Sequence, residues 1–260
     1  MTAFIAAENL WISHGAKDLV KGISFQGNRG EVLGILGESG CGKSLSCLGI
    51  LGLLPPGLSM SGSITLEDKP FDGNSCRSRL GSSIAAILQN PMSCFDPVFT
   101  VRDHFQETAK AHGLVGDDRF YLQSLEEVGL GNEAKLLDMF PFQLSGGMLQ
   151  RIMIALALVA DAPFLVADEP TTDLDVINQA RILNLLEDLR IKRNMGMILV
   201  THDLGVLAKL ADRIMVMKDG EALETGTTEE IFSKPSSDYT AKLVSTHFRL
   251  CGETERMSAI

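Results

Sequence analysis

The feature that most constrains this chain is a glycine-rich loop of the pattern Gly-x4-Gly-Lys-Ser at Gly37–Ser44. The short apolar run Glu31–Leu36 precedes it, and Gly42–Leu54 has the composition of a helix that two prolines stop. Backbone N–H groups of such a loop can wrap phosphate groups, because glycine lets the main chain approach closely. A chance match would lack this strand–loop–helix context, so the sequence predicts a phosphate-binding loop within an α/β fold.

Two further motifs follow along the chain. Residues 144–151 read Leu-Ser-Gly-Gly-Met-Leu-Gln-Arg and stand at the start of a predicted helix. The apolar run Phe164–Ala167 then ends in Asp168 and Glu169, directly before Pro170. Four apolar residues indicate a buried strand, and a carboxylate at its end can hold magnesium through water. The second carboxylate is placed to accept a proton from an attacking water.

The rest of the chain alternates between strand and helix patterns. Single apolar residues spaced among polar ones in the first forty positions, such as Leu10, Ile12 and Val20, indicate strands. Further strands are predicted at Ser61–Glu67, Ile84–Leu88, Met197–Thr201 and Arg213–Lys218. Helices are predicted at Val101–His112, Phe120–Val128, Met148–Val159, Val176–Arg193, Leu204–Leu210, Glu229–Phe232 and Tyr239–Phe248. Helical periodicity dominates residues 90–143, which are therefore expected to form a helical subdomain inserted into the α/β core.

Composition and charge narrow the function classes. The length of 260 residues allows one large domain or one with a small satellite, and 45% hydrophobic residues provide a substantial core. A net charge of -10 with scattered Lys and Arg argues against nucleic acid as a partner. The cysteines are odd in number and lack Cys-x-x-Cys spacing, so reduced thiols are expected rather than disulfides or a zinc site. They are Cys41, Cys47, Cys76, Cys94 and Cys251.

No targeting or membrane-spanning segment is expected. Met1–Ile5 lacks a basic region followed by a long apolar stretch, which a signal peptide would show. The longest apolar runs, Ile152–Ala160 and Leu48–Leu54, are much shorter than the roughly 20 residues that span a bilayer. We therefore expect a chain that is soluble on its own and that can bind a membrane partner.

Taken together, the glycine loop, the Ser-Gly-Gly-x-x-Gln signature and the Asp-Glu pair resemble those of the ATP-binding cassette (ABC) ATPases, from about Leu10 to about Gly226. This resemblance implies an α/β fold of the P-loop NTPase class, an ABC cassette with a RecA-like core, an antiparallel β subdomain and an inserted helical subdomain. Residues 1–89 and 144–226 would form the nucleotide-binding core. Residues 90–143 would be the helical subdomain that contacts a permease, and residues 227–260 a C-terminal helical extension.

The resemblance also implies roles in binding ATP and Mg²⁺. Lys43 would contact the β- and γ-phosphates, and Ser44, Gln89 and Asp168 would be the magnesium ligands, directly or through water. Glu169 would be the catalytic base, and His202 would contact the γ-phosphate and hold the attacking water. The loop residues that would wrap the phosphates are Gly37, Glu38, Ser39, Gly40, Cys41 and Gly42. A thiol reagent on the cysteine of this loop is expected to block nucleotide binding.

The signature implies a shared site. Ser145, with the N–H groups of Gly146 and Gly147, would form an anion site at a positive helix end. In the family this site completes the nucleotide site of a second subunit, so that two ATP molecules lie between two cassettes. Asp175 would lie at the same interface. The chain departs from the family at the position that contacts the adenine base. That position usually holds a stacking aromatic residue, and here it aligns with His14.

The type of ABC ATPase is narrowed further by what the chain lacks and by local resemblance. About 120 residues separate the ATP motifs, with no heptad run and a single cassette, which favours a transporter subunit. Residues 89–97 and Pro235–Ser245 resemble the peptide and nickel importer group. The signature segment Met148–Gln150, Asp173 and the short tail with Cys251 favour its nickel branch.

The implied function is an ATPase subunit that powers import of nickel, or of a nickel or other metal chelate, across a bacterial inner membrane. It would be peripheral, on the cytoplasmic face. Its partners would be a second ABC ATPase, identical or not, two permeases and a substrate-binding protein acting through them. A di- or oligopeptide importer is the alternative, and a soluble ABC ATPase acting on nucleic acid or a ribosome is less favoured. The residues leave open the cargo, the pairing, the transport direction and the role of the tail.

Overall fold

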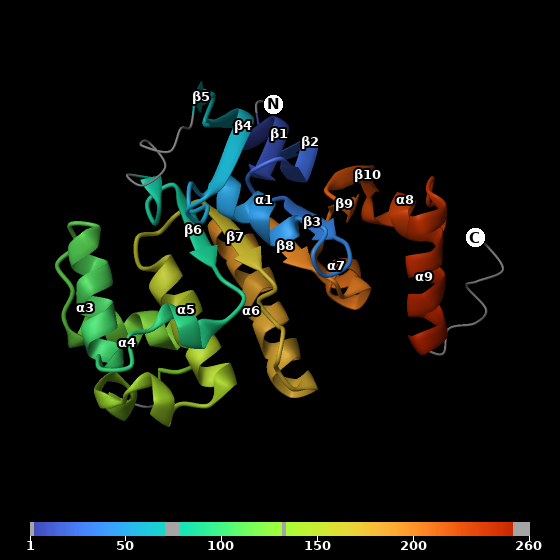
Figure 1. The fold of residues 1–260 in the computed structure, drawn as a ribbon. Helices are drawn as coiled ribbons and strands as arrows, with labels where there is room; N and C mark the ends of the chain where they lie inside the picture. Colours follow the sequence, from blue (N-terminus) through green and yellow to red (C-terminus); the bar gives the residue numbers. More distant parts are fainter. Residues whose placement is uncertain (1–2, 71–78, 132–133, 252–260) are drawn as a thin grey trace. The chain divides into compact units, whose positions relative to one another are not determined.

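The computed structural model describes residues 3–70, 79–131 and 134–251 (Figure 1). Contacts between Cα atoms divide the chain into two units. Unit 1 is made of Met1–Arg77 and Gly196–Ile260, and unit 2 is Ser78–Met195. Cys76 lies outside the described residues. The chain therefore leaves unit 1 after its first third and returns to it for its last quarter.

An antiparallel sheet begins unit 1. Its strand order is β2-β1-β4-β5, and the strands are β1 (Ile5–His14), β2 (Lys17–Gly27), β4 (Leu58–Leu66) and β5 (Lys69–Pro70). A tight turn with Gly15 at a φ of 60° joins β1 to β2. Leu10 and Ile12 are fully buried, whereas Trp11 between them is exposed, as strand alternation requires. Trp11 therefore points away from the face that its two neighbours bury.

The second sheet of unit 1 carries the glycine loop. Its strands are β3 (Val32–Leu36), β8 (Gly196–Thr201), β9 (Arg213–Lys218) and β10 (Glu221–Thr227). Strand β3 pairs in parallel with β8 on one side and β9 on the other, and β10 pairs antiparallel with β9. All five residues of β3 are buried, as expected for a central parallel strand covered on both faces.

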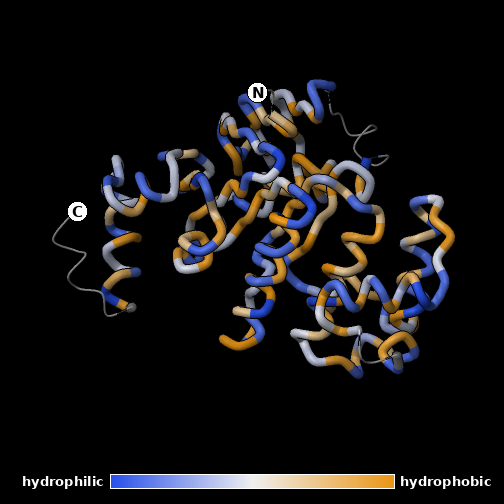
Figure 2. The backbone as a smooth tube through the Cα atoms, turned by 180° about the vertical axis from the view of Figure 1, so that it is seen from behind, coloured by the Kyte–Doolittle hydropathy of each residue, from blue (hydrophilic) through white to orange (hydrophobic). Residues whose placement is uncertain are grey.

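Within its described residues, unit 1 also contains the helices α1 (Lys43–Ile50), α7 (Leu204–Leu210), α8 (Thr228–Ser233) and α9 (Asp238–Cys251). Along α9, hydrophobic and hydrophilic residues alternate in bands (Figure 2). Val244 and Phe248 of this helix are buried, and the Phe248 ring contacts the ring of Phe232 in α8 with 6.1 Å between centroids. Helix α9 is therefore packed onto unit 1 by one apolar face.

In its described residues, unit 2 contains two parallel strands and a set of helices. Strand β6 (Ile84–Ile87) pairs with β7 (Phe164–Asp168). The helices are α3 (Val101–Ala111), α4 (Asp118–Glu127), α5 (Gly146–Leu158) and α6 (Val176–Arg193), with short 3-10 turns at Pro91–Cys94, Ala134–Asp138 and Pro141–Gln143. The buried rings of Phe105 and Tyr121 stack at 5.3 Å and join α3 to α4.

These elements confirm the predicted α/β class with an antiparallel β sheet and a helix-rich segment. Several details differ from the predicted elements, and two of them have a plain physical reason. Helix α1 ends at Ile50 rather than Leu54, because Gly52 takes a left-handed φ of 67°. Strand β10 was not predicted, since its residues are mostly polar and exposed. The predicted boundaries at residues 89, 143 and 226 stay a prediction. No helix in the described part of the chain combines the length and apolar character needed to cross a membrane.

Shortening a buried side chain of β3 should destabilise the fold. Ile35→Ala removes a side chain that is 0% exposed, so we expect a loss of about 2–5 kcal/mol in the free energy of unfolding. Chemical denaturation followed by circular dichroism measures it. The matched control is Ile191→Ala on α6, where the side chain is 67% exposed and the change should stay within about 0.5 kcal/mol. Equal losses in the two variants would contradict the assigned core.

Candidate functional site

The glycine loop joins β3 to α1 and has a conformation that its glycines permit. Gly40 and Gly42 have φ angles of 82° and 105°, in the left-handed region that favours glycine. At Gly37 a Cβ atom would lie 2.4 Å from the Met217 carbonyl oxygen and 2.6 Å from the Cys41 sulfur. Because neither neighbour leaves room for a side chain, glycine at this position lets the loop pass close against β9.

Lys43 is the buried cation at the start of α1. Its side chain is only 4% exposed, and its Nζ atom donates hydrogen bonds to the carbonyl oxygens of Gly37 and Glu38, each at 2.8 Å. Gly42 is the N-cap of helix α1, and no side chain caps the first N–H groups of this helix. Ser44 is half-buried in the first turn. A positive charge and a positive helix end thus meet at the loop, as binding of an anion requires.

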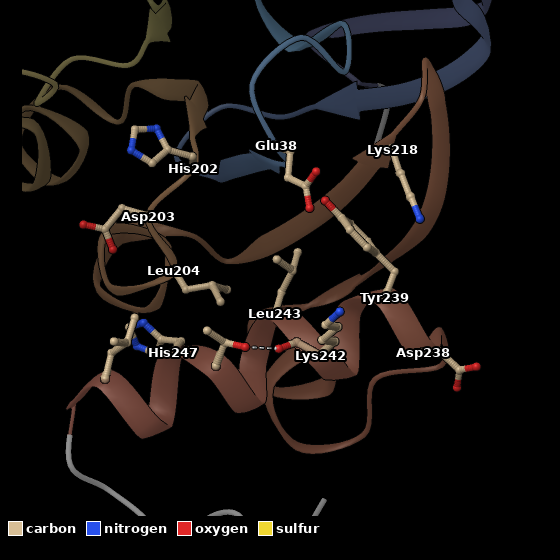
Figure 3. Close-up of a pocket in the computed structure, with 12 residues that line it drawn as sticks. Glu38, His202, Asp203, Leu204, Lys218, Asp238, Tyr239, Lys242, Leu243 and His247 are labelled. Carbon is tan, nitrogen blue, oxygen red and sulfur yellow. Dashed lines mark hydrogen bonds between the residues drawn. The ribbon is translucent and has the colours of Figure 1, made fainter.

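The remaining predicted residues of unit 1 are His202 and His14. His202 follows β8 and is exposed, directly before Asp203, which caps α7 by accepting a hydrogen bond from the Gly205 N–H at 2.7 Å. His202 and Glu38 line the same cavity of about 810 Å³, so the structure brings one predicted histidine to the glycine loop (Figure 3). His14 is exposed at the end of β1, beside Gly57.

Unit 2 brings Gln89 and Glu169 together across 80 positions of the chain. The Gln89 Nε2 atom donates a hydrogen bond to Glu169 Oε2 at 3.2 Å. The Thr172 hydroxyl donates to the same oxygen at 2.8 Å, a contact that the sequence did not suggest. Asp168 is buried at the end of β7, one residue before Glu169. The carboxylate of Glu169 is therefore oriented by two neutral donors.

The backbone at Glu169 is unusual. Its φ angle is 47°, a left-handed value that non-glycine residues seldom adopt and that costs on the order of 1–3 kcal/mol. Such strained residues concentrate at functional sites. The left-handed residue turns the chain sharply after β7, so that Thr172 can reach back to the Glu169 carboxylate.

The signature begins a helix, as predicted. Ser145 is the N-cap of α5, and its hydroxyl accepts a hydrogen bond from the Met148 N–H at 3.3 Å. A Cβ atom at Gly146 would meet no atom within 4 Å, so this position borders open space. At Gly147 a Cβ atom would lie 2.8 Å from the Asn178 side chain. The signature helix therefore presents its start to open space on one side and contacts α6 on the other.

Asn178 links the signature to Asp175, and the sequence analysis missed it. Asp175 caps α6, and Asn178 donates to its carboxylate from the backbone N–H at 2.9 Å and from Nδ2 at 2.6 Å. These hydrogen bonds, the backbone one foremost, lower the pKa of Asp175. The sequence pattern that could have predicted this contact is an aspartate at a helix start followed three residues later by an asparagine. The Asn178 side chain thus lies against both Asp175 and Gly147.

The residues fit a nucleotide with magnesium. Lys43 and the loop N–H groups suit phosphate oxygens, and the Ser44 hydroxyl, the Gln89 amide oxygen and the Asp168 carboxylate are oxygen ligands of the kind that magnesium prefers. Within residues 3–70, 79–131 and 134–251, no three His, Cys, Asp or Glu side chains cluster to hold a metal by themselves. Magnesium keeps waters and is usually bound through one or two carboxylates and the phosphates of its substrate.

Comparison with known proteins points to one family. The model of the family described as ABC transporter matches residues 20–172, which include the glycine loop, Gln89, the signature and the Asp168–Glu169 pair. The nickel import ATP-binding protein NikD of Rhodospirillum rubrum is 46% identical over 237 residues, covering 90% of each chain. The protein of the same name in Pseudomonas putida is 47% identical over 237 residues, covering 90% of this chain and 91% of that one.

Solved structures agree with this similarity. CbiO1 of Clostridium perfringens, described as part of the ABC transporter complex cbiONQ, has a TM-score of 0.77 and 26% identity, over 98% of this chain and 99% of that chain. The dimeric post-hydrolysis structure of the ATP-binding cassette MJ0796, bound to ADP and Pi, has a TM-score of 0.74 and 25% identity, over 86% and 98%. The predicted cassette fold is thereby confirmed.

The thiol of Cys41 offers a chemical test of the loop. Burial raises the pKa of this thiol and outweighs the nearby Lys43 ammonium, which acts to lower it. Since the thiolate is the reactive form, we expect slow maleimide labelling at neutral pH and labelling that still accelerates as the pH passes 9.0. Peptide mapping by mass spectrometry measures it.

Labelled protein should bind no ATP, because the thiol lies against Gly37 and an adduct would displace the loop. The control is Cys41→Ala, which should keep ATP binding after the same treatment. Equal loss of binding in that variant would show that other cysteines are responsible.

Proposed function

We propose a function for this chain from one premise: it belongs to the ABC transporter family. As a member it is an ATP-binding subunit, and we propose that it hydrolyses ATP to power import of nickel, or of a nickel or other metal chelate, across a bacterial inner membrane. The assignment of nickel as the cargo is supported by sequence identities of 46% and 47%, over nine tenths of the chain, to two nickel import ATP-binding proteins. The chain would act as a peripheral subunit on the cytoplasmic face.

Phosphate binding is assigned to the glycine loop. Residues Gly37 to Ser44 would surround the phosphates with backbone N–H groups, and Lys43 would exchange its two carbonyl partners for phosphate oxygens. Ser44, Gln89 and Asp168 would hold Mg²⁺, which neutralises charge on the phosphates when it is bound. His14 would contact the adenine. What supports this assignment is the buried ammonium of Lys43 together with the family membership.

Proton transfer is assigned to Glu169. Its carboxylate accepts hydrogen bonds from two neutral donors, Gln89 and Thr172, which orient it. A carboxylate held in this way can take a proton from a water that attacks the terminal phosphate. His202 would donate a hydrogen bond to that phosphate and keep the water in line. These roles rest on the family membership and on the contacts within each unit.

The signature is assigned a role in binding to a second cassette. Ser145, Gly146 and Gly147 would bind the terminal phosphate of ATP held by a neighbouring cassette, and the open space at Gly146 suits such an approach. Asp175 would lie at the same interface. The similarity to a dimeric cassette bound to ADP and Pi supports a dimer as the working form. We propose two permeases and a substrate-binding protein acting through them as the further partners.

Replacing the base should separate binding from hydrolysis. Glu169→Gln keeps the size and most hydrogen bonds of the side chain but cannot accept the proton, so ATP turnover should fall by about 10²–10⁴-fold with ATP affinity retained. Lys43→Ala should instead weaken ATP binding by about tenfold or more. Phosphate release and equilibrium binding of a fluorescent ATP analogue measure the two effects.

The matched control is Glu107→Gln, which makes the same change at an exposed position of α3 and should leave turnover unchanged. A Glu169→Gln variant that turns over ATP at the wild-type rate would remove Glu169 from the proposed role.

Cargo is tested in cells. Deleting the gene should lower accumulation of radioactive nickel, because the importer would lose its source of energy. A wild-type copy should restore uptake, and a Glu169→Gln copy should not. Normal nickel accumulation together with impaired uptake of a labelled dipeptide would assign the chain to a peptide importer instead.

A further inference from the structure

Helix α9, which the ATP chemistry does not use, begins at a firmly held position beside the glycine loop. In the segment before it, the backbone N–H groups of Ser236 and Ser237 donate to the Glu224 carboxylate of β10, at 2.6 Å and 3.2 Å. Burial acts to raise the pKa of Glu224, but the hydrogen bonds it accepts, including one from Thr240, outweigh burial and lower it. The start of α9 is therefore fixed to the sheet by a charged acceptor.

The first turn of α9 is held from within as well. Thr240 is fully buried, its N–H donates to the Ser237 hydroxyl oxygen at 3.0 Å, and the two hydroxyl groups lie 2.7 Å apart. Further along, Val244 and Phe248 pack into unit 1. Tyr239, between Ser237 and Thr240, therefore projects from a rigid backbone.

The Tyr239 side chain reaches toward the glycine loop. Its ring lies over the Lys218 ammonium, with 4.8 Å between Nζ and the ring centroid. Its hydroxyl is buried and, among the residues that the structure describes, has no hydrogen-bond partner. Figure 3 shows this hydroxyl pointing toward the Glu38 carboxylate, in the wall of the same cavity. Burial and then the negative charge of Glu38 raise the pKa of Tyr239, so the hydroxyl keeps its proton as a donor.

Glu38 connects this hydroxyl to the phosphate site. Its backbone carbonyl accepts the Lys43 hydrogen bond, while its carboxylate faces Tyr239. When Lys43 turns to a phosphate, that carbonyl keeps the hydrogen bond that it accepts from the Cys41 N–H at 3.3 Å, while the bound triphosphate repels the nearby carboxylate. A buried donor without a partner is costly, and the Glu38 carboxylate is the acceptor that Tyr239 faces. Both effects favour a hydrogen bond between Tyr239 and Glu38 once ATP is bound.

We propose that Tyr239 is a positioning residue for the phosphate loop, whose hydroxyl receives the Glu38 carboxylate and holds it away from the triphosphate. The C-terminal helix then contributes to ATP affinity without touching the nucleotide. The inference rests on the proposed function, because it deepens the account of the same ATP site. It gives the C-terminal extension a role that the sequence left open.

Tyr239→Phe tests the hydroxyl alone. We expect the dissociation constant and the KM for ATP to rise by about three- to tenfold, while kcat at saturating ATP stays within about twofold. Loss of a merely structural contact would lower thermal stability without this split between KM and kcat. The control is Tyr121→Phe, since Tyr121 is the only other tyrosine and its hydroxyl donates to the Gly116 carbonyl oxygen in unit 2. That variant should bind ATP as the wild type does.

A double-mutant cycle assigns the effect to Glu38. Glu38→Gln removes the charge that Tyr239 would control, so adding Tyr239→Phe to it should weaken ATP binding by less than about twofold. An unchanged dissociation constant in Tyr239→Phe would overturn the inference, and so would full additivity with Glu38→Gln. If the wild-type chain bound no ATP at all, the proposed function itself would fail, and this inference with it.

Discussion

The phosphate loop depends on one buried charge, the ammonium group of Lys43. A buried cation is costly unless hydrogen bonds replace its water, and here the carbonyl oxygens of Gly37 and Glu38 do so at 2.8 Å each. Gly40 and Gly42 lie between those carbonyls and Lys43, and both take left-handed conformations that favour glycine. The central, fully buried strand β3 in turn fixes where the loop begins. The loop is thus shaped around a positive charge whose present partners are weaker acceptors than phosphate oxygens.

The carboxylate of Glu169 is held by a different principle. An amide donor from Gln89 and a hydroxyl donor from Thr172 both reach its Oε2 atom. The strained backbone at Glu169 makes the Thr172 contact possible. Strain in the main chain thereby accompanies the orientation of a side chain at the site.

Features carried by local sequence could be predicted, and features made by tertiary contact could not. Glycine spacing and four apolar residues before an acidic pair specify the loop and β7 within a few positions, and the order of the motifs implied the cassette fold. Strand β10 has no such pattern, because pairing with β9 rather than burial defines it. Thr172, Asn178 and Tyr239 are ordinary residue types at their positions. Only their contacts with Glu169, Gly147 and Glu38 give them a role, and those partners lie from 3 to 201 positions away.

Each unit orients its own charged groups with its own residues. Lys43 is held by carbonyls of its loop in unit 1, and Glu169 accepts hydrogen bonds from two donors of unit 2. Under the proposed function one nucleotide would take contacts from both sets. A ligand shifts a conformational equilibrium only by its difference in affinity between the states. Because the groups are oriented beforehand, little of the ATP binding energy is spent on arranging them, and more remains to change how the two units and a second cassette associate.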